Sequence, residues 1–149
     1  MAQTQAQQPH KSSIGGIDAN LMVLIAYLGS AVLAFIPIVQ FVAFLLPLVL
    51  FFLEKESPFV RFHAMQSFIL YICCDVLMIV LSIISTIALA GLSLASLGVV
   101  SVLGILILVV QILYAVLCVL AVLKAWKYET FRIPLVGDWA DKFAAKLGK

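Results

Sequence analysis

The sequence contains little charge. Of its 149 residues, only 9 are Lys or Arg and 7 are Asp or Glu, and the formal net charge is +2. A hydrophobic content of 65% and a mean hydropathy of +1.24 leave too little polar surface to cover a soluble globule of this size. The composition therefore excludes an ordinary soluble domain, and it predicts that a lipid bilayer covers much of the surface.

Signatures of catalysis and of cofactor binding are missing as well. The sequence has no HExxH, GxSxG, GxxxxGK or paired-carboxylate arrangement, so we expect no enzymatic activity. The cysteines Cys73, Cys74 and Cys118 all lie in apolar runs, where they predict neither a disulfide framework nor a metal clip. His63 is the only histidine near an apolar segment, so one chain cannot supply two haem ligands or a complete zinc site. The sequence thus predicts no cofactor and no metal.

The charges that are present lie almost entirely in three short polar segments. The long apolar stretches between these segments contain a single charged residue, Asp75. This segregation is typical of an integral membrane protein. We divide the chain into a polar, Gln-rich arm at 1–18 that we expect to be disordered, a transmembrane domain at 19–127 and an amphipathic tail at 128–149.

The first apolar run, residues 21–53, would form a helix of roughly 50 Å, well beyond the roughly 30 Å hydrocarbon core of a bilayer. Pro37 should break it, because proline lacks a backbone donor and disfavours helix at the residue before it. We predict two short helices at 19–35 and 38–53. Because both are near the lower limit for spanning, a re-entrant hairpin is the alternative to two crossings.

Two longer helices should follow. Ser57 is a suitable N-cap and Pro58 suits the first turn, so one helix should run from 58 to about 90, and a small-residue turn should lead to a last span at 99–123. The predicted fold class is all-α: an integral membrane four-helix bundle with a C-terminal amphipathic interfacial helix. Four crossings place all three charged segments on one face, which the positive-inside tendency makes cytoplasmic, in the cytoplasmic membrane with both termini inside.

The tail has a regular apolar stripe. Leu135, Trp139, Phe143 and Leu147 recur every four residues, and charged residues occupy the other side. This pattern predicts an interfacial helix that contacts anionic lipid headgroups and not nucleic acid; recruitment of a partner protein is the alternative.

Asp75 should lie near the middle of the membrane. If the last two helices are antiparallel neighbours, Tyr71, Asp75, Gln111 and Tyr114 share one depth. An intramembrane carboxyl can mark a proton or solute path, which here would need an oligomer, or it can be a neutral group hydrogen-bonded to Gln111 between helices. We favour the structural interpretation because a path needs several titratable groups.

Three segments resemble a known family. They are AYLG at 26–29, SPFVRFHAMQS at 57–67 and KAWKYETFRIPLVGDWADKFA at 124–144, and together they resemble the Tic-twenty-like family of small four-helix membrane proteins. The residues that carry the resemblance are Phe59, Arg61, Phe62, His63, Gln66, Arg132, Pro134 and Gly137.

The resemblance implies a four-helix membrane domain and, by analogy with plastid relatives in the protein-import translocon, a part in protein translocation. From the residues themselves, we expect Arg61 and His63 to face headgroups, and His63 and Gln66 to hydrogen-bond the returning tail near Pro134. We therefore expect a non-enzymatic, multi-pass membrane protein, with a homo-oligomer or another membrane protein as its partner. The alternative is a small oligomeric channel or transporter centred on Asp75.

Overall fold

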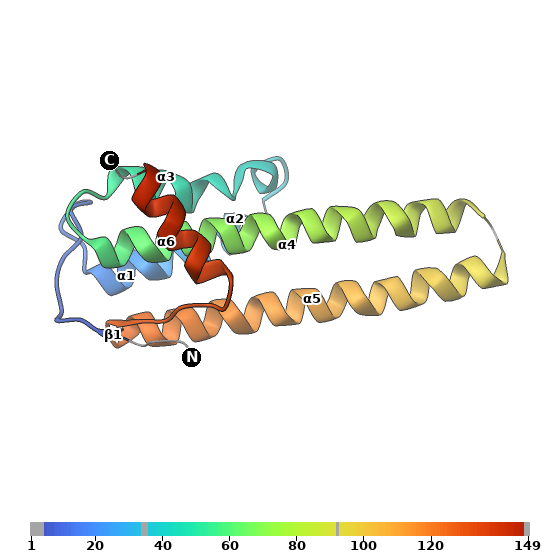
Figure 1. The fold of residues 1–149 in the computed structure, drawn as a ribbon. Coiled ribbons are helices and arrows are strands. Elements are labelled where there is room, and N and C mark those ends of the chain that lie inside the picture. Colours follow the sequence, from blue (N-terminus) through green and yellow to red (C-terminus); the bar gives the residue numbers. More distant parts are fainter. Residues whose placement is uncertain (1–4, 34–35, 92, 148–149) are drawn as a thin grey trace. The chain divides into compact units, whose positions relative to one another are not determined.

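A computed structural model of the chain describes residues 5–33, 36–91 and 93–147 (Figure 1). In chain order the elements are β1 (Gln5–Ala6), α1 (Ala19–Leu24), the π-helical turn η1 (Ile25–Gly29), α2 (Ser30–Leu33), the 3-10 turn η2 (Val39–Val42), α3 (Leu45–Leu53), α4 (Pro58–Ala90), α5 (Leu94–Trp126), β2 (Glu129–Thr130) and α6 (Val136–Leu147). The predicted all-α character is confirmed, with one antiparallel pair of two-residue strands added.

The contacts divide the chain into two compact units. Unit 1 contains Met1–Tyr71 and Leu117–Lys149, and unit 2 contains Ile72–Val116. Every charged residue except Asp75 belongs to unit 1. The segregation seen in the sequence is therefore also a division between the two units.

Unit 1 holds the core. Its buried residues include the aromatic side chains of Tyr27, Phe51 and Phe59, together with the polar side chains of His63 and Gln66. The N-terminal arm joins this core, because β1 pairs with β2 in the register Gln5↔Thr130 and Ala6↔Glu129. We predicted a disordered arm, but residues 5–18 make ordered contacts with segments far away in the sequence.

The first apolar run forms a hairpin in unit 1. Helix α3 packs against η1 and α2, and the two arms approach so closely that a Cβ on Gly29 would lie 2.7 Å from Leu46 Cδ2. Ser67 Oγ donates a hydrogen bond to the carbonyl of Ala26 (2.9 Å), which ties the irregular η1 turn to α4.

Helix α3 is much shorter than predicted, because it begins at Leu45 and not near residue 38. Pro47 explains the difference. A helix starting at 38 would need a backbone donor at Pro47, whereas in the observed helix Pro47 lies in the first turn, where no intrahelical acceptor is required. The turn before it bends sharply, with Ile38 at a φ of 72°.

Helix α4 starts and ends where the sequence predicts. Ser57 Oγ accepts a hydrogen bond from Val60 N (3.2 Å), as an N-cap residue does. The last long helix, α5, is extended at both ends relative to the prediction. Among the residues that the structure describes, α4 and α5 are the two helices that are long and apolar enough to cross a membrane, so the predicted four spanning helices are not confirmed.

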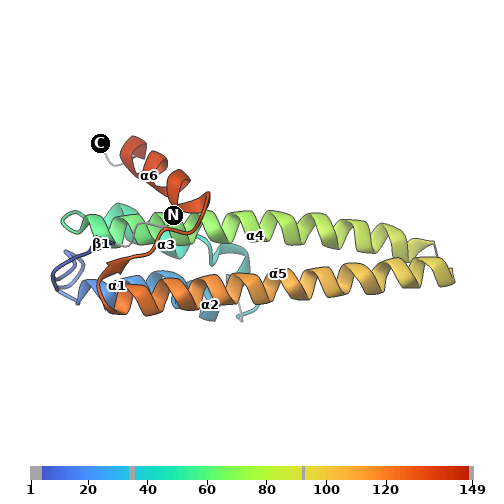
Figure 2. The ribbon, with the colours of Figure 1, turned by 60° about the horizontal axis from the view of Figure 1, so that its bottom comes forward.

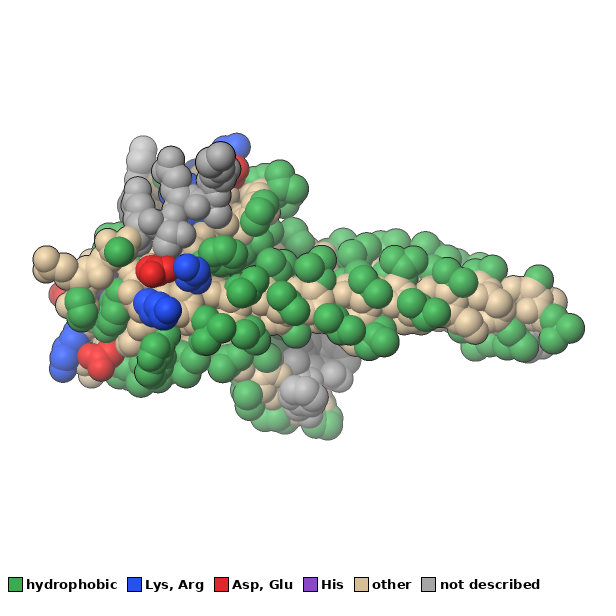
Figure 3. Space-filling view, turned by 90° about the horizontal axis from the view of Figure 1, so that it is seen from below, with side chains coloured by type: hydrophobic (Ala, Val, Ile, Leu, Met, Phe, Trp, Pro, Cys, Tyr) green, Lys and Arg blue, Asp and Glu red, His purple; other side chains and the backbone are tan. Residues whose placement is uncertain are grey.

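Unit 2 consists of the remaining parts of α4 and α5, which run antiparallel (Figure 2). Among its described residues only Leu81 is buried. Apolar side chains cover its surface, and the Lys, Arg, Asp and Glu side chains in view gather on unit 1 (Figure 3). A surface of this kind requires lipid or another apolar cover.

Candidate functional site

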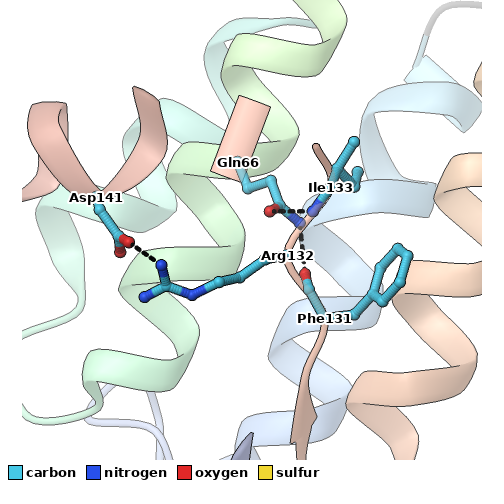
Figure 4. A network of polar contacts seen from close by, with 5 residues as sticks. All are labelled: Gln66, Phe131, Arg132, Ile133 and Asp141. Atoms are coloured by element: carbon cyan, nitrogen blue, oxygen red, sulfur yellow. Dashed lines mark hydrogen bonds and ion pairs between the residues drawn. The ribbon is translucent and has the colours of Figure 1, made fainter. Parts of the chain in front are cut away.

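Gln66 connects three segments of unit 1. Its side chain is fully buried. Its Nε2 donates hydrogen bonds to Tyr27 Oη (2.8 Å) and to the carbonyl of Phe131 (3.0 Å), and its Oε1 accepts one from Ile133 N (3.1 Å; Figure 4). One amide from α4 therefore binds both the hairpin and the backbone that leads into α6, as the sequence predicted for Gln66 and the tail.

Gly137 completes this arrangement. A Cβ at this position would lie 3.1 Å from Arg132 Cβ and 3.2 Å from Gln66 Oε1, so α6 approaches closely here and an added Cβ would force these neighbours to shift by a few tenths of an ångström. Gly137 N also donates a hydrogen bond to the carbonyl of Ile133 (2.7 Å). We call Gln66, Phe131, Ile133 and Gly137 the tail clamp. Pro134 is exposed at the start of this turn and does not contact Gln66 through a hydrogen bond.

Arg132 lies beside the tail clamp and forms an ion pair with Asp141 of α6. Its Nη1 is 2.7 Å from Asp141 Oδ2 (Figure 4), and its guanidinium carbon lies 5.5 Å from the centre of the Phe62 ring. Both partners of the ion pair are about two-fifths exposed, so solvent screens their attraction. The contact orients the helix more than it stabilises it.

The structure places His63 differently from the prediction that it faces headgroups, whereas the same expectation for Arg61 stays a prediction. His63 is completely buried, with ring centroids 4.8 Å from Phe59, 5.3 Å from Phe62 and 6.1 Å from Tyr27. Neither ring nitrogen has a hydrogen-bond partner among the described residues, so His63 does not bind the tail. The guanidinium of Arg61 lies 4.9 Å from the centre of the Phe51 ring.

Glu54 is a buried carboxylate that the sequence pattern did not indicate as a candidate. Its Oε1 accepts hydrogen bonds from Ser13 Oγ (2.6 Å) and from the backbone N–H groups of Ser13, Glu56 and Ser57 (3.0–3.1 Å), and its Oε2 accepts one from Ser12 Oγ. Burial alone would raise the pKa of Glu54, but these hydrogen bonds outweigh it and lower the pKa from 4.5 to about 2. We call Ser12, Ser13 and Glu54 the arm latch.

The arm latch joins the N-terminal arm to the start of α4. His10 reinforces it, with its Nε2 2.7 Å from Ser57 Oγ and its ring 5.9 Å from that of Phe59. A carboxylate at the N-terminus of a helix also compensates the positive end of the helix dipole. The only sequence signal was the position of Glu54 just before the Ser57 cap, and nothing local indicated its partners in the arm.

The four residues of the predicted intramembrane cluster are divided between the two units. Asp75, Gln111 and Tyr114 belong to unit 2, whereas Tyr71 belongs to unit 1. Asp75 and Gln111 are both exposed, and the described structure has no hydrogen bond between them. Asp75 instead lines a shallow groove along one face of α4, together with Ser82 and Thr86. The pairing inferred from their matched depth remains a prediction.

The chemistry of these contacts is hydrogen bonding, ion pairing and packing. In the ranges that the structure describes, no three His, Cys, Asp or Glu side chains come close enough together to hold a metal ion. The tail clamp and the arm latch hold both ends of the chain against α4. Both sets of contacts lie within the polar, charged unit 1.

A comparison with protein-family models identifies the family. Residues 18–140 match the model described as the magnetosome magnetite crystal formation protein family, MamF/MmsF. The chain belongs to this family. The match covers most of the chain, including Glu54, the tail clamp and both long helices, and it begins after Ser12 and Ser13 of the arm latch.

Membership in the magnetite crystal formation family corrects the resemblance drawn from the sequence. The assignment to a Tic-twenty-like family was wrong, and the family that matches is the magnetosome one. The translocation role was inferred from that assignment and has no support from the matched family. Comparisons with curated proteins and with solved structures gave no match.

Proposed function

We propose that this protein acts in magnetite crystal formation as a non-catalytic, multi-pass protein of the magnetosome membrane, and that it acts from the cytoplasmic side. Family membership supports the process, and the apolar helices support the membrane location. The observation that carries the proposal is the separation of a charged, folded unit 1 from an apolar unit 2 whose surface requires lipid.

The lengths of the helical parts in unit 2 fit a bilayer. Residues 72–90 of α4 and 94–116 of α5 correspond to roughly 28 Å and 34 Å, close to the roughly 30 Å hydrocarbon core. Asp75 is the single charged residue that this placement puts into lipid. All nine Lys and Arg residues lie outside unit 2, and the positive-inside tendency therefore supports a cytoplasmic unit 1 with both termini on that side.

In this orientation the protein would present no charged segment to the crystal. A magnetosome is a magnetite crystal enclosed by a membrane, and the segment that would face its interior is the turn between α4 and α5, which carries no charge. Carboxylates that could bind iron ions all lie on the opposite side, apart from Asp75. The protein would then affect the crystal through the membrane or through proteins at its cytoplasmic surface, and not as a mineral template.

Helix α6 supplies a surface for contact with the membrane. Its Gly137 and Ala140 are buried against unit 1, while Leu135, Trp139, Phe143 and Leu147 remain exposed in the stripe that the sequence predicted. Lys142 and Lys146 are exposed as well. An apolar stripe with Trp beside lysines is suited to the headgroup region of anionic lipid, and the tail clamp holds α6 at a fixed position on α4.

The test is a deletion in a magnetite-forming bacterium, followed by complementation. We expect the deletion to change the size distribution of the crystals in electron micrographs. Wild-type protein and Gln8→Ala should restore the distribution, because the Gln8 side chain is exposed, whereas Gln66→Ala should restore it incompletely. Crystals unaffected by the deletion, or a protein absent from the purified magnetosome membrane, would contradict the proposal.

A further inference from the structure

Asp75 is the one charged residue of unit 2, because all nine Lys and Arg residues and the other acidic residues belong to unit 1. Its side chain is exposed, and among the residues that the structure describes no hydrogen bond or ion pair includes it. Ionisable residues in transmembrane segments almost always pair with a compensating group. Gln111 is a neutral amide and cannot compensate a charge, so we looked for a partner outside the chain.

In the membrane placement proposed above, Asp75 lies near the edge of the hydrocarbon core. The part of α4 that belongs to unit 2 begins at Ile72, three residues or roughly 4.5 Å before Asp75. The Cα–Cβ bonds of a helix tilt toward its N-terminus, and the N-terminal part of α4 belongs to unit 1. The carboxyl group of Asp75 therefore reaches the level of the lipid headgroups, where a cationic headgroup can meet it.

A shallow groove of about 500 Å³ begins at Asp75 and follows one face of α4 to Ile87. Its other lining residues are mostly apolar, and Ile79, Ile83 and Ile87 are each more than half exposed. From Asp75 to Ile87 the helix rises roughly 18 Å, close to the roughly 15 Å of hydrocarbon in one leaflet. The groove thus has a carboxylate at the headgroup end and the length of one acyl chain below it.

We propose that this groove binds phosphatidylethanolamine from the leaflet next to unit 1. The primary ammonium of the headgroup donates charge-assisted hydrogen bonds to the Asp75 carboxylate, and one acyl chain lies along the groove. Thr86 Oγ1 donates to the carbonyl of Ser82 within the helix (2.9 Å), so this hydroxyl leaves no unmet donor beside the chain. A choline headgroup has no N–H donor, and a glycerol headgroup has no positive charge. The proposal rests on the membrane placement of the proposed function, but not on any role in magnetite formation.

Photo-crosslinking in vesicles tests the choice of headgroup. The full-length protein is reconstituted into phosphatidylcholine vesicles that contain a small fraction of phosphatidylethanolamine, phosphatidylcholine or phosphatidylglycerol, each with the same diazirine-bearing acyl chain, and the adducts are mapped by mass spectrometry. We expect phosphatidylethanolamine to give severalfold more adducts at residues 78–87 than either other lipid. Equal yields from the three lipids at these residues would overturn the proposal. An absence of adducts from all three lipids throughout unit 2 would overturn the membrane placement as well.

Two pairs of variants test the residues of the groove. Asp75→Asn should lower the phosphatidylethanolamine yield to that of phosphatidylcholine, because the amide keeps the shape of the carboxylate without its charge, whereas Asp138→Asn, at an exposed position of α6, should keep the excess. Ile79→Trp should fill the groove and lower the yields from all three lipids. Ile84→Trp, at a similarly exposed position that does not line the groove, should leave them unchanged. An excess that persists in Asp75→Asn, or equal losses in the two tryptophan variants, would overturn the proposal.

Discussion

Replacing Gln66 by alanine tests the tail clamp. The substitution leaves Tyr27 Oη and Ile133 N buried without their partner, and it also removes the partner of the half-buried Phe131 carbonyl. A buried polar group that loses its partner costs about 1–3 kcal/mol. With two fully buried groups affected, we expect α6 and the preceding segment to be destabilised by about 3 kcal/mol, which increases the population of released tail about a hundredfold.

Two probes follow this release. The two tryptophans of the chain, Trp126 and Trp139, both lie in the C-terminal part of unit 1, so their fluorescence reports on its unfolding in detergent micelles. Trypsin cleavage after Arg132 and Lys142 reports on local opening, because cleavage tracks the open population when closing is fast.

The matched control is Gln8→Ala, the same chemical change at an exposed position of the N-terminal arm. It should leave both the fluorescence transition and the cleavage rate unchanged. If Gln66→Ala behaves like this control, then the buried hydrogen bonds do not hold the tail and our account of the clamp is incorrect.

Three further substitutions distinguish the contacts around the clamp. Gly137→Ala should lower the midpoint of the tryptophan fluorescence transition, because the new Cβ would crowd Arg132 Cβ and Gln66 Oε1 and reduce the free energy of unfolding by about 1–2 kcal/mol. An unchanged midpoint would show that α6 can shift to make room. Arg132→Ala should cost less, about 1 kcal/mol or below in the same assay, because its ion pair with Asp141 is partly exposed; a loss as large as that of Gln66→Ala would contradict this ranking. The arm latch should open in acid. The folded-state pKa of Glu54 is about 2, below its ordinary value of 4.5. The ionised Glu54 therefore stabilises the folded state above about pH 4.5, and this stabilisation is lost as the pH falls toward 2. Glu54→Gln should weaken attachment of the arm at neutral pH and remove this acid dependence. Both effects are measured by protease access to Lys11. A steep acid transition that persists in the variant would show that another group causes the transition.

The features that the sequence predicted correctly depend on local patterns. Ser57 followed by Pro58 fixes the start of α4, because the cap and the first turn need only neighbouring residues. The four-residue apolar repeat in the tail likewise predicts α6. The segregation of charge, which requires no knowledge of contacts, anticipated the division into a polar and an apolar unit.

The features that were missed depend on contacts between distant segments. Glu54 and the arm are far apart in the chain. A Gln-rich arm with one lysine gives no local sign that its serines donate hydrogen bonds to a buried carboxylate. His63 and Gln66 looked equivalent as candidates for binding the tail, and only the packing of Phe59 and Phe62 around the imidazole separates them. The short α3 is different, because Pro47 was a local signal that could have been used.

The orientation of the protein in isolated magnetosomes tests the central claim most directly. In the background with the native cysteines replaced by alanine, Lys142→Cys reports on unit 1, and Ser93→Cys reports on the turn between α4 and α5. We predict that an impermeant maleimide labels Lys142→Cys on intact magnetosomes and labels Ser93→Cys only after the membrane is dissolved. Labelling of Ser93→Cys on intact magnetosomes, with Lys142→Cys protected, would place the charged unit against the crystal and contradict the account.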